Sequence, residues 1–195
     1  MGIDYILDYD ERTEDINRTA IPTPWEVINE VMDGGLAGGE LGVVVAPSGV
    51  GKSWALCALG AAAVKMGKTV VHYSLELSEH YVGQRYDTVF TQIPSTKLAD
   101  KRDEVKDVIS KLRGRMLIKY FPPKGISAKK LETHIEKMIS NGYKPDLIII
   151  DYADLLISYT NKSDSTYQEQ GGIYIELRGM SGEMNIPIWT ASQAN

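Results

Sequence analysis

Short apolar runs alternate along this chain with longer segments in which apolar residues recur every three or four positions. The short runs predict strands at 43–45, 69–75, 116–120, 147–151 and 186–191, of which 69–75 is predicted to be buried. The longer segments predict helices over about 24–33, 53–66, 78–90, 97–112, 127–140 and 166–184. Strands that alternate with helices in this way favour an α/β fold with a mostly parallel five-stranded sheet and helices on both faces.

The first and last of these helices each carry apolar residues at helical spacing. In the first helix, Thr23 is predicted as the N-cap, Pro24 as the first helical residue and Glu26 as the residue that closes a capping box. Its predicted buried stripe consists of Trp25, Ile28, Val31 and Met32. The stripe predicted for the last helix consists of Ile173, Leu177, Met180 and Met184.

The chain has the size and composition of one folded domain. It has 195 residues, of which 43% are hydrophobic and 24% are charged. Residues 1–22 show no sustained periodicity and are rich in acids, so they are predicted to form an arm that packs on the domain or on a neighbouring subunit. Residues 23–195 are predicted to form the domain, because no linker or repeat divides them.

The charge and the cysteine content narrow the class of protein. A formal net charge of −5 argues against a basic surface that coats nucleic acid, although a local site that threads a single strand stays open. The only cysteine, Cys57, lies in an apolar helical segment, which favours a packing role and a reducing cytosol. No apolar run approaches the length of a membrane span, so we expect a cytoplasmic protein without a membrane partner. The three histidines, at 72, 80 and 134, lack the spacing of metal ligands.

The stretch LGVVVAPSGVGKSWA has the pattern of a strand, a glycine-rich turn and the start of a helix. Gly49 and Gly51 allow the backbone to point its N–H groups at an anion, and the N-terminus of the following helix faces the same point. Lys52 can reach the β- and γ-phosphates of a nucleotide, and the hydroxyl of Ser53 can ligate a magnesium ion. The stretch therefore predicts a phosphate loop of the Walker A type.

One residue departs from the Walker A pattern. Ala46 stands where the first glycine usually lies, and alanine adds only a methyl group at that position. We therefore still expect the loop to bind ATP with Mg²⁺. The residues predicted to hold the nucleotide are Ala46, Pro47, Ser48, Gly49, Val50, Gly51, Lys52, Ser53 and Trp54.

Polar side chains follow several of the predicted strands, at the edge of a parallel sheet where ligands bind. Asp151 ends the most apolar strand, as in the Walker B pattern, in which a carboxylate holds the magnesium ion. Glu76 is the candidate that orients and deprotonates the attacking water, and Gln193 can donate a hydrogen bond to the γ-phosphate. Lys52, Glu76 and Gln193 are thus the predicted catalytic residues, and Ser53 and Asp151 the predicted metal ligands. Taken singly, Asp151 is equally well explained as a solvated acid at a strand end, Glu76 is better explained as a solvated surface glutamate, and Gln193 has the alternative of an amide packed at a loop.

Four segments together resemble the RecA-like motor domain of DnaB-type replicative helicases, and among these the helicases of T-even phages. The segments are IPTPWEVINEVMDGGLAGGELGVVVAPSGVGKS (Ile21–Ser53), SLE (Ser74–Glu76), DLIIIDYADLL (Asp146–Leu156) and WTASQAN (Trp189–Asn195). The resemblance implies a RecA-like P-loop ATPase core in which Glu76 is the catalytic glutamate, Asp151 the Walker B acid and Gln193 the sensor. It also implies single-stranded DNA as a partner, a homo-hexamer for the full-length protein, contacts with primase and a helicase loader, and the host cytoplasm for a phage-encoded enzyme.

Two departures from the family pattern limit what the resemblance implies. Asp154 occupies a position where the bacterial enzymes commonly carry glutamine, so no signalling role is transferred to it. Family members continue past the sensor into a DNA-contacting loop, an arginine finger and further strands, whereas this sequence ends at Asn195. We therefore expect slow basal hydrolysis and a largely monomeric chain.

The arginines and the loop after the Walker B strand add further expectations. Arg85 and Arg178 are expected to make local ion pairs or, for Arg178, subunit contacts. The loop around 161–165, whose only base is Lys162, is placed by the resemblance at the channel for DNA. One lysine neutralises little phosphate charge, so the isolated chain should bind DNA weakly and with a shallow salt dependence.

Three functional hypotheses stay open at this point. The first is the ATPase core of a ring helicase that translocates on single-stranded DNA. The second is a RecA-type or circadian-clock-type ATPase that remodels proteins or pairs strands. The third is a nucleotide-binding interaction module with little turnover. A small-molecule kinase fits least well, because Glu76 has no place in its chemistry and no arginine-rich lid follows the third helix.

Overall fold

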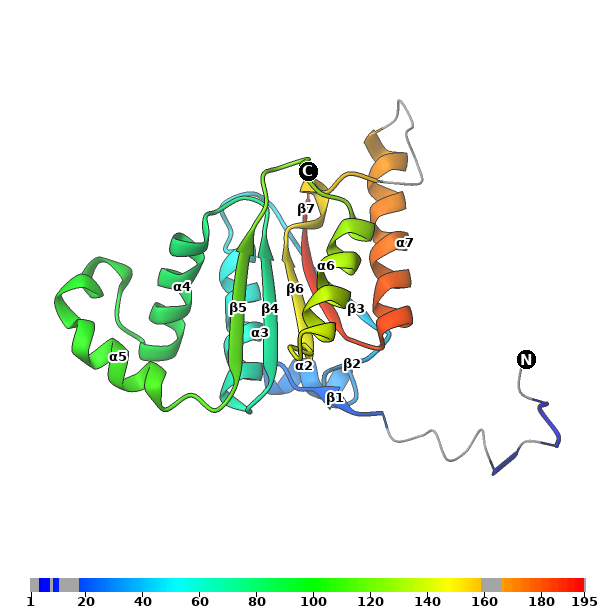
Figure 1. Cartoon of the computed structure of the whole chain (residues 1–195), viewed down its shortest axis with the longest axis horizontal. Coiled ribbons are helices and arrows are strands. Elements are labelled where there is room, and N and C mark those ends of the chain that lie inside the picture. The colour runs from blue at the N-terminus through cyan, green and yellow to red at the C-terminus, as the bar shows by residue number, and fades with distance from the viewer. Residues whose placement is uncertain (1–3, 8, 11–17, 159–165, 195) are drawn as a thin grey trace.

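The computed structural model describes residues 4–7, 9–10, 18–158 and 166–194, and its centre is a sheet between two layers of helices (Figure 1). The sheet has five parallel strands, in the spatial order β3 (Leu41–Ala46), β7 (Ile188–Gln193), β6 (Leu147–Asp151), β4 (Thr69–Ser74) and β5 (Arg115–Tyr120). This confirms the predicted α/β class and the parallel five-stranded sheet. Among the helices in these ranges, none combines the length and the apolar character needed to cross a bilayer.

The helices divide between the two faces of the sheet, as predicted (Figure 1). α3 (Lys52–Lys65) and α4 (Glu79–Thr91) lie on one face, and α6 (Ala128–Ser140) and α7 (Thr166–Met184) lie on the other. Cys57 is buried in α3, and burial raises the pKa of its thiol to about 12. The packing role predicted for this cysteine is therefore confirmed.

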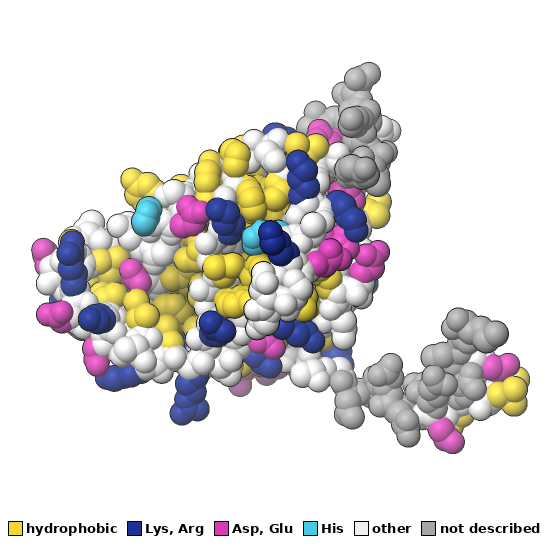
Figure 2. Space-filling model, viewed as in Figure 1, with side chains coloured by type: hydrophobic (Ala, Val, Ile, Leu, Met, Phe, Trp, Pro, Cys, Tyr) yellow, Lys and Arg dark blue, Asp and Glu magenta, His cyan; other side chains and the backbone are white. Residues whose placement is uncertain are grey.

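The single helix predicted over 97–112 is wrong in part. The structure has two short 3-10 turns, η1 (Ser95–Lys97) and η2 (Ala99–Lys101), followed by α5 (Arg102–Ser110). α5 begins where two acids occupy its first turn, and the helix dipole favours acids at that end. Figure 2 shows apolar side chains in the hollow between α5 and the body of the domain, with charged side chains around them. Ile93, Leu98 and Val105 form a small separate cluster here, so α5 packs on α4 and not on the sheet.

Strand β6 is buried along its whole length, and each of its five residues is at most 1% exposed. Alternate side chains of a strand point to opposite faces. Ile148 and Ile150 therefore contact the core under α6 and α7, whereas Leu147 and Ile149 contact the core under α3. A strand that is buried on both faces needs an unbroken apolar run, which is why the sequence predicted this strand correctly.

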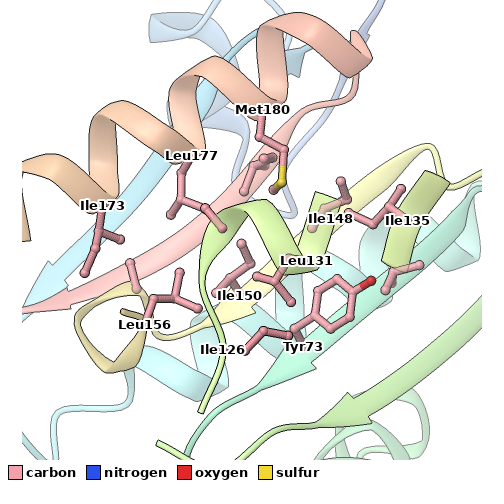
Figure 3. Close-up of a cluster of buried hydrophobic side chains, with 14 of the residues drawn as sticks. Tyr73, Ile126, Leu131, Ile135, Ile148, Ile150, Leu156, Ile173, Leu177 and Met180 are labelled. Atoms are coloured by element: carbon pink, nitrogen blue, oxygen red, sulfur yellow. The ribbon is translucent and has the colours of Figure 1, made fainter. Parts of the chain in front are cut away.

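The predicted stripe of α7 packs onto the sheet (Figure 3). Ile173, Leu177 and Met180 are buried in the same cluster as Ile148 and Ile150, and Met184 packs against the cluster while partly exposed. Burial of each such side chain stabilises the fold by about 1.5–3 kcal/mol. The apolar face of the last helix is thus confirmed.

The first predicted helix forms, but its predicted bounds, N-cap and buried stripe are wrong. α2 spans only Glu26–Val31, and its N-cap is Trp25 rather than Thr23. Thr23 instead accepts a hydrogen bond on its hydroxyl from the Trp25 N–H (3.2 Å), while the side chain of Asn29 bonds to both backbone groups of Thr23. These bonds hold Thr23 in a turn, so the capping box with Glu26 does not form. The predicted stripe is also wrong, because α2 buries none of its residues. Trp25 and Ile28 are each 39% exposed, and Val31 is 83% exposed. Of the four predicted residues, only Met32, just after the helix, packs partly into the core.

The last part of the predicted N-terminal arm packs on the domain. β1 (Ala20–Ile21) pairs antiparallel with β2 (Leu36–Ala37), and Arg18 forms an ion pair with Glu40 at 2.7 Å. Residues 1–3, 8 and 11–17 lie outside the described residues. The domain boundary at residue 22 stays a prediction.

The sheet ends on β3 at one edge and on β5 at the other. Within the described residues, β3 pairs with β7 alone, and its Val45 is 63% exposed and Val43 36% exposed. In this part of the chain, the strand that leads into the glycine-rich loop thus has a free backbone edge and an apolar surface.

His72 lies in β4, fully buried beside α4. Its Nδ1 shares a hydrogen bond of 2.8 Å with the hydroxyl of Tyr86, and its Nε2 has no partner among the described residues. Burial, together with the nearby charge of Arg85, lowers the pKa of His72 to about 3. The imidazole therefore stays neutral in the folded protein over the whole range in which a free histidine titrates.

We predict that His72 makes the folded state less stable as the pH falls. Between about pH 3 and 6.5 the unfolded chain binds a proton at His72 that the folded chain does not, so the free energy of unfolding decreases with decreasing pH. From pH 6.5 to 5 this loss should be about 2 kcal/mol. Urea unfolding at several pH values should show that the free energy of unfolding falls less on acidification for His72→Asn than for the wild type.

The matched control is His80→Gln, because His80 is exposed on α4. It should keep the wild-type dependence of stability on pH. Equal slopes for the wild type and His72→Asn would contradict the prediction, whatever the absolute stability of the variant.

Candidate functional site

A pocket of about 200 Å³ lies at the carboxyl ends of the strands, where the phosphate loop joins β3 to α3. Its walls come from the loop, from the segments after β4 and β6, from α4 and from the end of β7. The lining residues are Ser48, Gly49, Gly51, Lys52, Ser53, Trp54, Glu76, Arg85, Tyr152 and Gln193. Segments far apart in sequence thus meet at this edge, as a parallel sheet requires.

The structure brings the three predicted catalytic residues together, since Lys52, Glu76 and Gln193 all line this pocket. Of the predicted metal ligands, Ser53 lines the pocket and Asp151 lies beneath it, joined to Ser53 by a hydrogen bond. Six of the nine residues predicted to hold the nucleotide are among the lining residues; Ala46, Pro47 and Val50 are not.

The glycine-rich loop has the backbone of an anion cradle. Gly49 and Gly51 have φ angles of +78° and +102°, which are strained for any residue with a side chain. Nothing lies within 4 Å of where a Cβ would stand on either glycine, and both glycines line the pocket. Lys52 folds back over the loop and donates hydrogen bonds from Nζ to the carbonyl oxygens of Ala46 (2.8 Å) and Pro47 (3.0 Å). The cation is therefore held at the mouth of the cradle.

Ala46 fits its place without strain. It is the last residue of β3, in extended backbone, and its Cα is paired with that of Gln193 on β7. Extended backbone is open to any residue, so the first glycine of the usual pattern is not needed for this conformation.

Asp151 is the most deeply buried polar residue of the site, at 1% exposure. Burial raises its pKa to about 6, against the opposing effects of the hydrogen bond from the Ser53 hydroxyl (3.1 Å to Oδ1) and the charge of Arg85. A carboxylate in this position gains from any cation that approaches it. The site is thus electrostatically prepared for a metal ion.

The residues present fit Mg²⁺ rather than a metal held by protein ligands alone. No group of three or more His, Cys, Asp or Glu side chains comes together for a metal in the described parts of the chain. The hydroxyl of Ser53 and the carboxylate of Asp151 are hard oxygen donors, and Mg²⁺ usually takes one or two such ligands together with water and phosphate oxygens. These two residues can hold the ion in this way when a nucleotide is bound.

Glu76 reaches the pocket because the segment after β4 is tied to the end of β6. The N–H of Leu75 donates a hydrogen bond of 2.7 Å to the carbonyl of Asp151. Glu76 follows directly, is exposed, and raises the pKa of Asp151 through its charge. An exposed carboxylate therefore stands in the pocket next to the carboxylate that can bind the metal ion.

The strand that carries Gln193 is displaced from its predicted position. The N–H of Ile186 donates to the carbonyl of Ser181 at the end of α7, so the ladder between β7 and β6 begins only at Ile188. β7 therefore spans Ile188–Gln193 instead of 186–191, and Gln193 is the last strand residue rather than a residue beyond the strand. Pairing with β3 places it beside the start of the phosphate loop.

Arg85 and Tyr152 line the pocket although the sequence analysis gave them no role there. The structure differs from the local ion pair expected for Arg85, since no ion pair of this side chain occurs within the described residues. Its guanidinium lies 5.4 Å from the ring centroid of Trp54, and its Nη1 is buried without a hydrogen-bond partner there. The signal in the sequence was helical spacing, because Arg85 follows the buried Val82 by three residues and so falls on the inner face of α4.

The comparisons with known proteins agree with this arrangement. The family model of the DnaB-like helicase C terminal domain matches residues 20–195. A DnaB-like replicative helicase of Enterobacteria phage T4 is 28% identical over 206 residues, which cover 99% of this chain and 43% of that protein. The chain thus spans less than half the length of this curated relative.

Two solved structures are similar in fold. The structure of a DnaB-like replicative helicase and its interactions with primase has a TM-score of 0.77 at 18% identity, over 99% of this chain and 49% of that one. The structure of a separate ATPase domain has a TM-score of 0.76 at 20% identity, over 96% of this chain and 68% of that one. The three-layer architecture is therefore shared at low sequence identity.

We predict that Lys52→Ala abolishes tight binding of Mg-ATP but leaves the fold intact. The Lys52 ammonium supplies the charge at the mouth of the cradle, and its two bonds go to loop carbonyls rather than to the core. Isothermal titration with Mg-ATP should show at least about a tenfold loss of affinity, with an unchanged circular dichroism spectrum.

Lys65→Ala is the matched control, because Lys65 lies in the last turn of the same helix and away from the pocket. It should bind Mg-ATP like the wild type. Wild-type affinity in Lys52→Ala would show that the nucleotide does not use this loop.

Proposed function

The chain belongs to the family of DnaB-like helicase C-terminal domains, and we propose that it hydrolyses ATP to drive translocation of a replicative helicase on single-stranded DNA. One observation carries the proposal. A phosphate cradle, a buried carboxylate joined to the loop serine, an exposed glutamate and a strand-end glutamine converge on one pocket. In-line attack of water on a γ-phosphate needs these groups in this arrangement.

We propose the following division of work among the residues. The loop N–H groups and Lys52 bind the β- and γ-phosphates, and Lys52 exchanges its two carbonyl partners for phosphate oxygens. Ser53 and Asp151 would hold Mg²⁺, which would supply positive charge to the phosphates of the nucleotide. Because Asp151 must be ionised for this, its raised pKa couples metal binding to pH near 6.

The proposed hydrolytic step uses the two exposed groups of the pocket. Glu76 accepts the proton of the attacking water, for which a carboxylate that lines the pocket without ligating the metal is suited. Gln193 donates a hydrogen bond to the γ-phosphate and loses this contact once phosphate has left. Arg85, whose Nη1 has no partner among the described residues, adds positive charge on the α4 side of the pocket.

The partners belong to the same proposal. We propose single-stranded DNA as the track, a homo-hexamer for the full-length protein, and contacts with primase and a helicase loader in the cytoplasm of the host. Support for primase comes from a structurally similar helicase, which is described with its interactions with primase. Support for a replicative role comes from the relative of phage T4.

We predict that Glu76→Gln binds Mg-ATP with nearly wild-type affinity but hydrolyses it at least about a hundredfold more slowly. The amide keeps the shape of the side chain and loses the basicity that the attacking water requires. Steady-state phosphate release and equilibrium titration, measured on the same preparation, separate the two effects.

The control is Glu136→Gln, which neutralises an exposed glutamate of α6 on the other face of the sheet. Its turnover should match that of the wild type. Normal turnover in Glu76→Gln would make this glutamate a bystander.

We also predict that the 195-residue chain by itself turns over slowly and responds little to DNA. Among the described arginines only Arg85 lines the pocket, and an arginine supplied by a neighbouring subunit is worth about 10³–10⁵ in rate. The rates of phosphate release with and without oligo-dT should differ by less than about tenfold, which is far below the rate factor of such an arginine. Fast turnover with strong stimulation by DNA would mean that an arginine of this chain acts on the pocket of a second copy.

A further inference from the structure

Asp154 lies in the short 3-10 turn η3 (Ala153–Leu155), just after the Walker B strand β6. Its two carboxylate oxygens accept hydrogen bonds from three groups on two other elements. Oδ2 accepts from the N–H of Gln193 (2.9 Å) and from the hydroxyl of Ser192 (3.2 Å), and Oδ1 accepts from the hydroxyl of Tyr174 (2.7 Å). The carboxylate thus joins the end of β7 to α7.

The position of Asp154 follows from a gap in the sheet. β7 pairs with β3 as far as Gln193, but its pairing with β6 ends at Thr190. On the β6 side, the last residues of β7 therefore have no neighbour among the described strands, and the Asp154 carboxylate takes the backbone N–H of Gln193 instead. A second tie holds η3 in place, because the N–H of Ala153 donates to the Thr190 hydroxyl (3.1 Å).

A carboxylate suits the converging groups. The N–H of Gln193 can only donate, and the hydroxyls of Ser192 and Tyr174 both donate here, so an acceptor without hydrogens of its own receives all three bonds. An asparagine would keep one oxygen for these donors and turn an uncharged NH₂ group toward a hydroxyl, which would then have to accept instead of donate. The Tyr174 hydroxyl keeps its proton throughout the physiological range, since burial raises its pKa, so it can make this donation.

The two ends of this connection lie in different environments. Gln193 lines the nucleotide pocket, whereas Tyr174 belongs to α7, whose neighbouring residues Ile173 and Leu177 are buried in the core. The Asp154 carboxylate thus joins a residue that lines the pocket to a helix that is packed on the sheet, through one hydrogen bond to each.

We propose that Asp154 is a positioning residue that fixes Gln193 in the nucleotide pocket and transmits the state of the pocket to α7 through Tyr174. This rests on the proposed function, in which Gln193 contacts the γ-phosphate. Asp154 distinguishes a bound triphosphate from a diphosphate only through Gln193, and it couples that difference to α7 only through Tyr174. The two links can be broken separately.

The experiment compares Asp154→Asn and Tyr174→Phe with the wild type. Titration calorimetry gives the dissociation constants of Mg-ATPγS and Mg-ADP, and hydrogen exchange reports the peptides that contain Gln193 and the first half of α7. In Asp154→Asn the preference for Mg-ATPγS over Mg-ADP should fall about tenfold, as expected for one lost hydrogen bond to a charged group. Affinity for Mg-ADP should change less than about twofold, and the Gln193 peptide should exchange faster even without nucleotide.

Tyr174→Phe should keep the nucleotide preference within about twofold, because Asp154 retains its bonds to β7. It should lose the protection that Mg-ATPγS gives to α7 in the wild type. Matched controls are Asp100→Asn and Tyr81→Phe, which alter exposed residues on η2 and α4 and should behave like the wild type in both measurements.

Three results would overturn the proposal. An unchanged nucleotide preference with unchanged exchange at Gln193 would show that Asp154 does not position this residue. An equal loss of affinity for both nucleotides would show a role in stability alone, and normal protection of α7 in Tyr174→Phe would remove the coupling. Failure of the wild type to bind Mg-ATPγS would instead contradict the proposed function. In that case, hydrogen exchange of the Gln193 peptide without nucleotide would still test whether Asp154 holds Gln193 in place.

Discussion

The complete burial of strand β6 is the constraint on which both the core and the site depend. Ile148 and Ile150 complete one layer of the core, and Leu147 and Ile149 complete the other, so the strand cannot shift by one residue without exchanging the two sets. This fixed register carries Asp151 to a place where water is almost excluded. The pKa of Asp151 is raised because the strand that holds it is so well packed. The strand that completes both layers of the core therefore also sets the burial of the carboxylate proposed to hold the metal ion.

The polar groups around the phosphate loop satisfy one another. Lys52 is the cation that a nucleotide needs, and in this structure it bonds to two loop carbonyls. Ser53 likewise donates to Asp151, the residue with which it can share a metal ion. In the proposed binding mode both side chains would exchange these partners for phosphate oxygens and a metal ion, which limits the net gain in affinity but holds the side chains near the pocket beforehand.

Sequence patterns predicted those features that depend on local order or on one continuous run. The central strands β4 and β6 and the stripe of α7 fall in this group, because two-sided burial requires apolar runs and one-sided burial requires helical spacing. The N-cap predicted for the first helix was wrong because the side chain of Asn29 binds the backbone of Thr23, a contact that the capping rules do not include. Arg85 and Asp154 were not predicted as parts of the site network, since their partners come from separate elements and meet only in the folded chain.

The open edge of β3 has a consequence for assembly. Within the described part of the chain, β3 presents one unpaired backbone edge and the exposed side chain of Val45 on the strand that ends directly in the phosphate loop. Such an edge is a template for one more strand, from another part of a longer chain or from a second molecule. A strand added there would restrain the backbone that leads into the cradle. Self-association and nucleotide affinity are then thermodynamically linked, so that an apparent dissociation constant would vary with protein concentration even if every pocket were chemically identical.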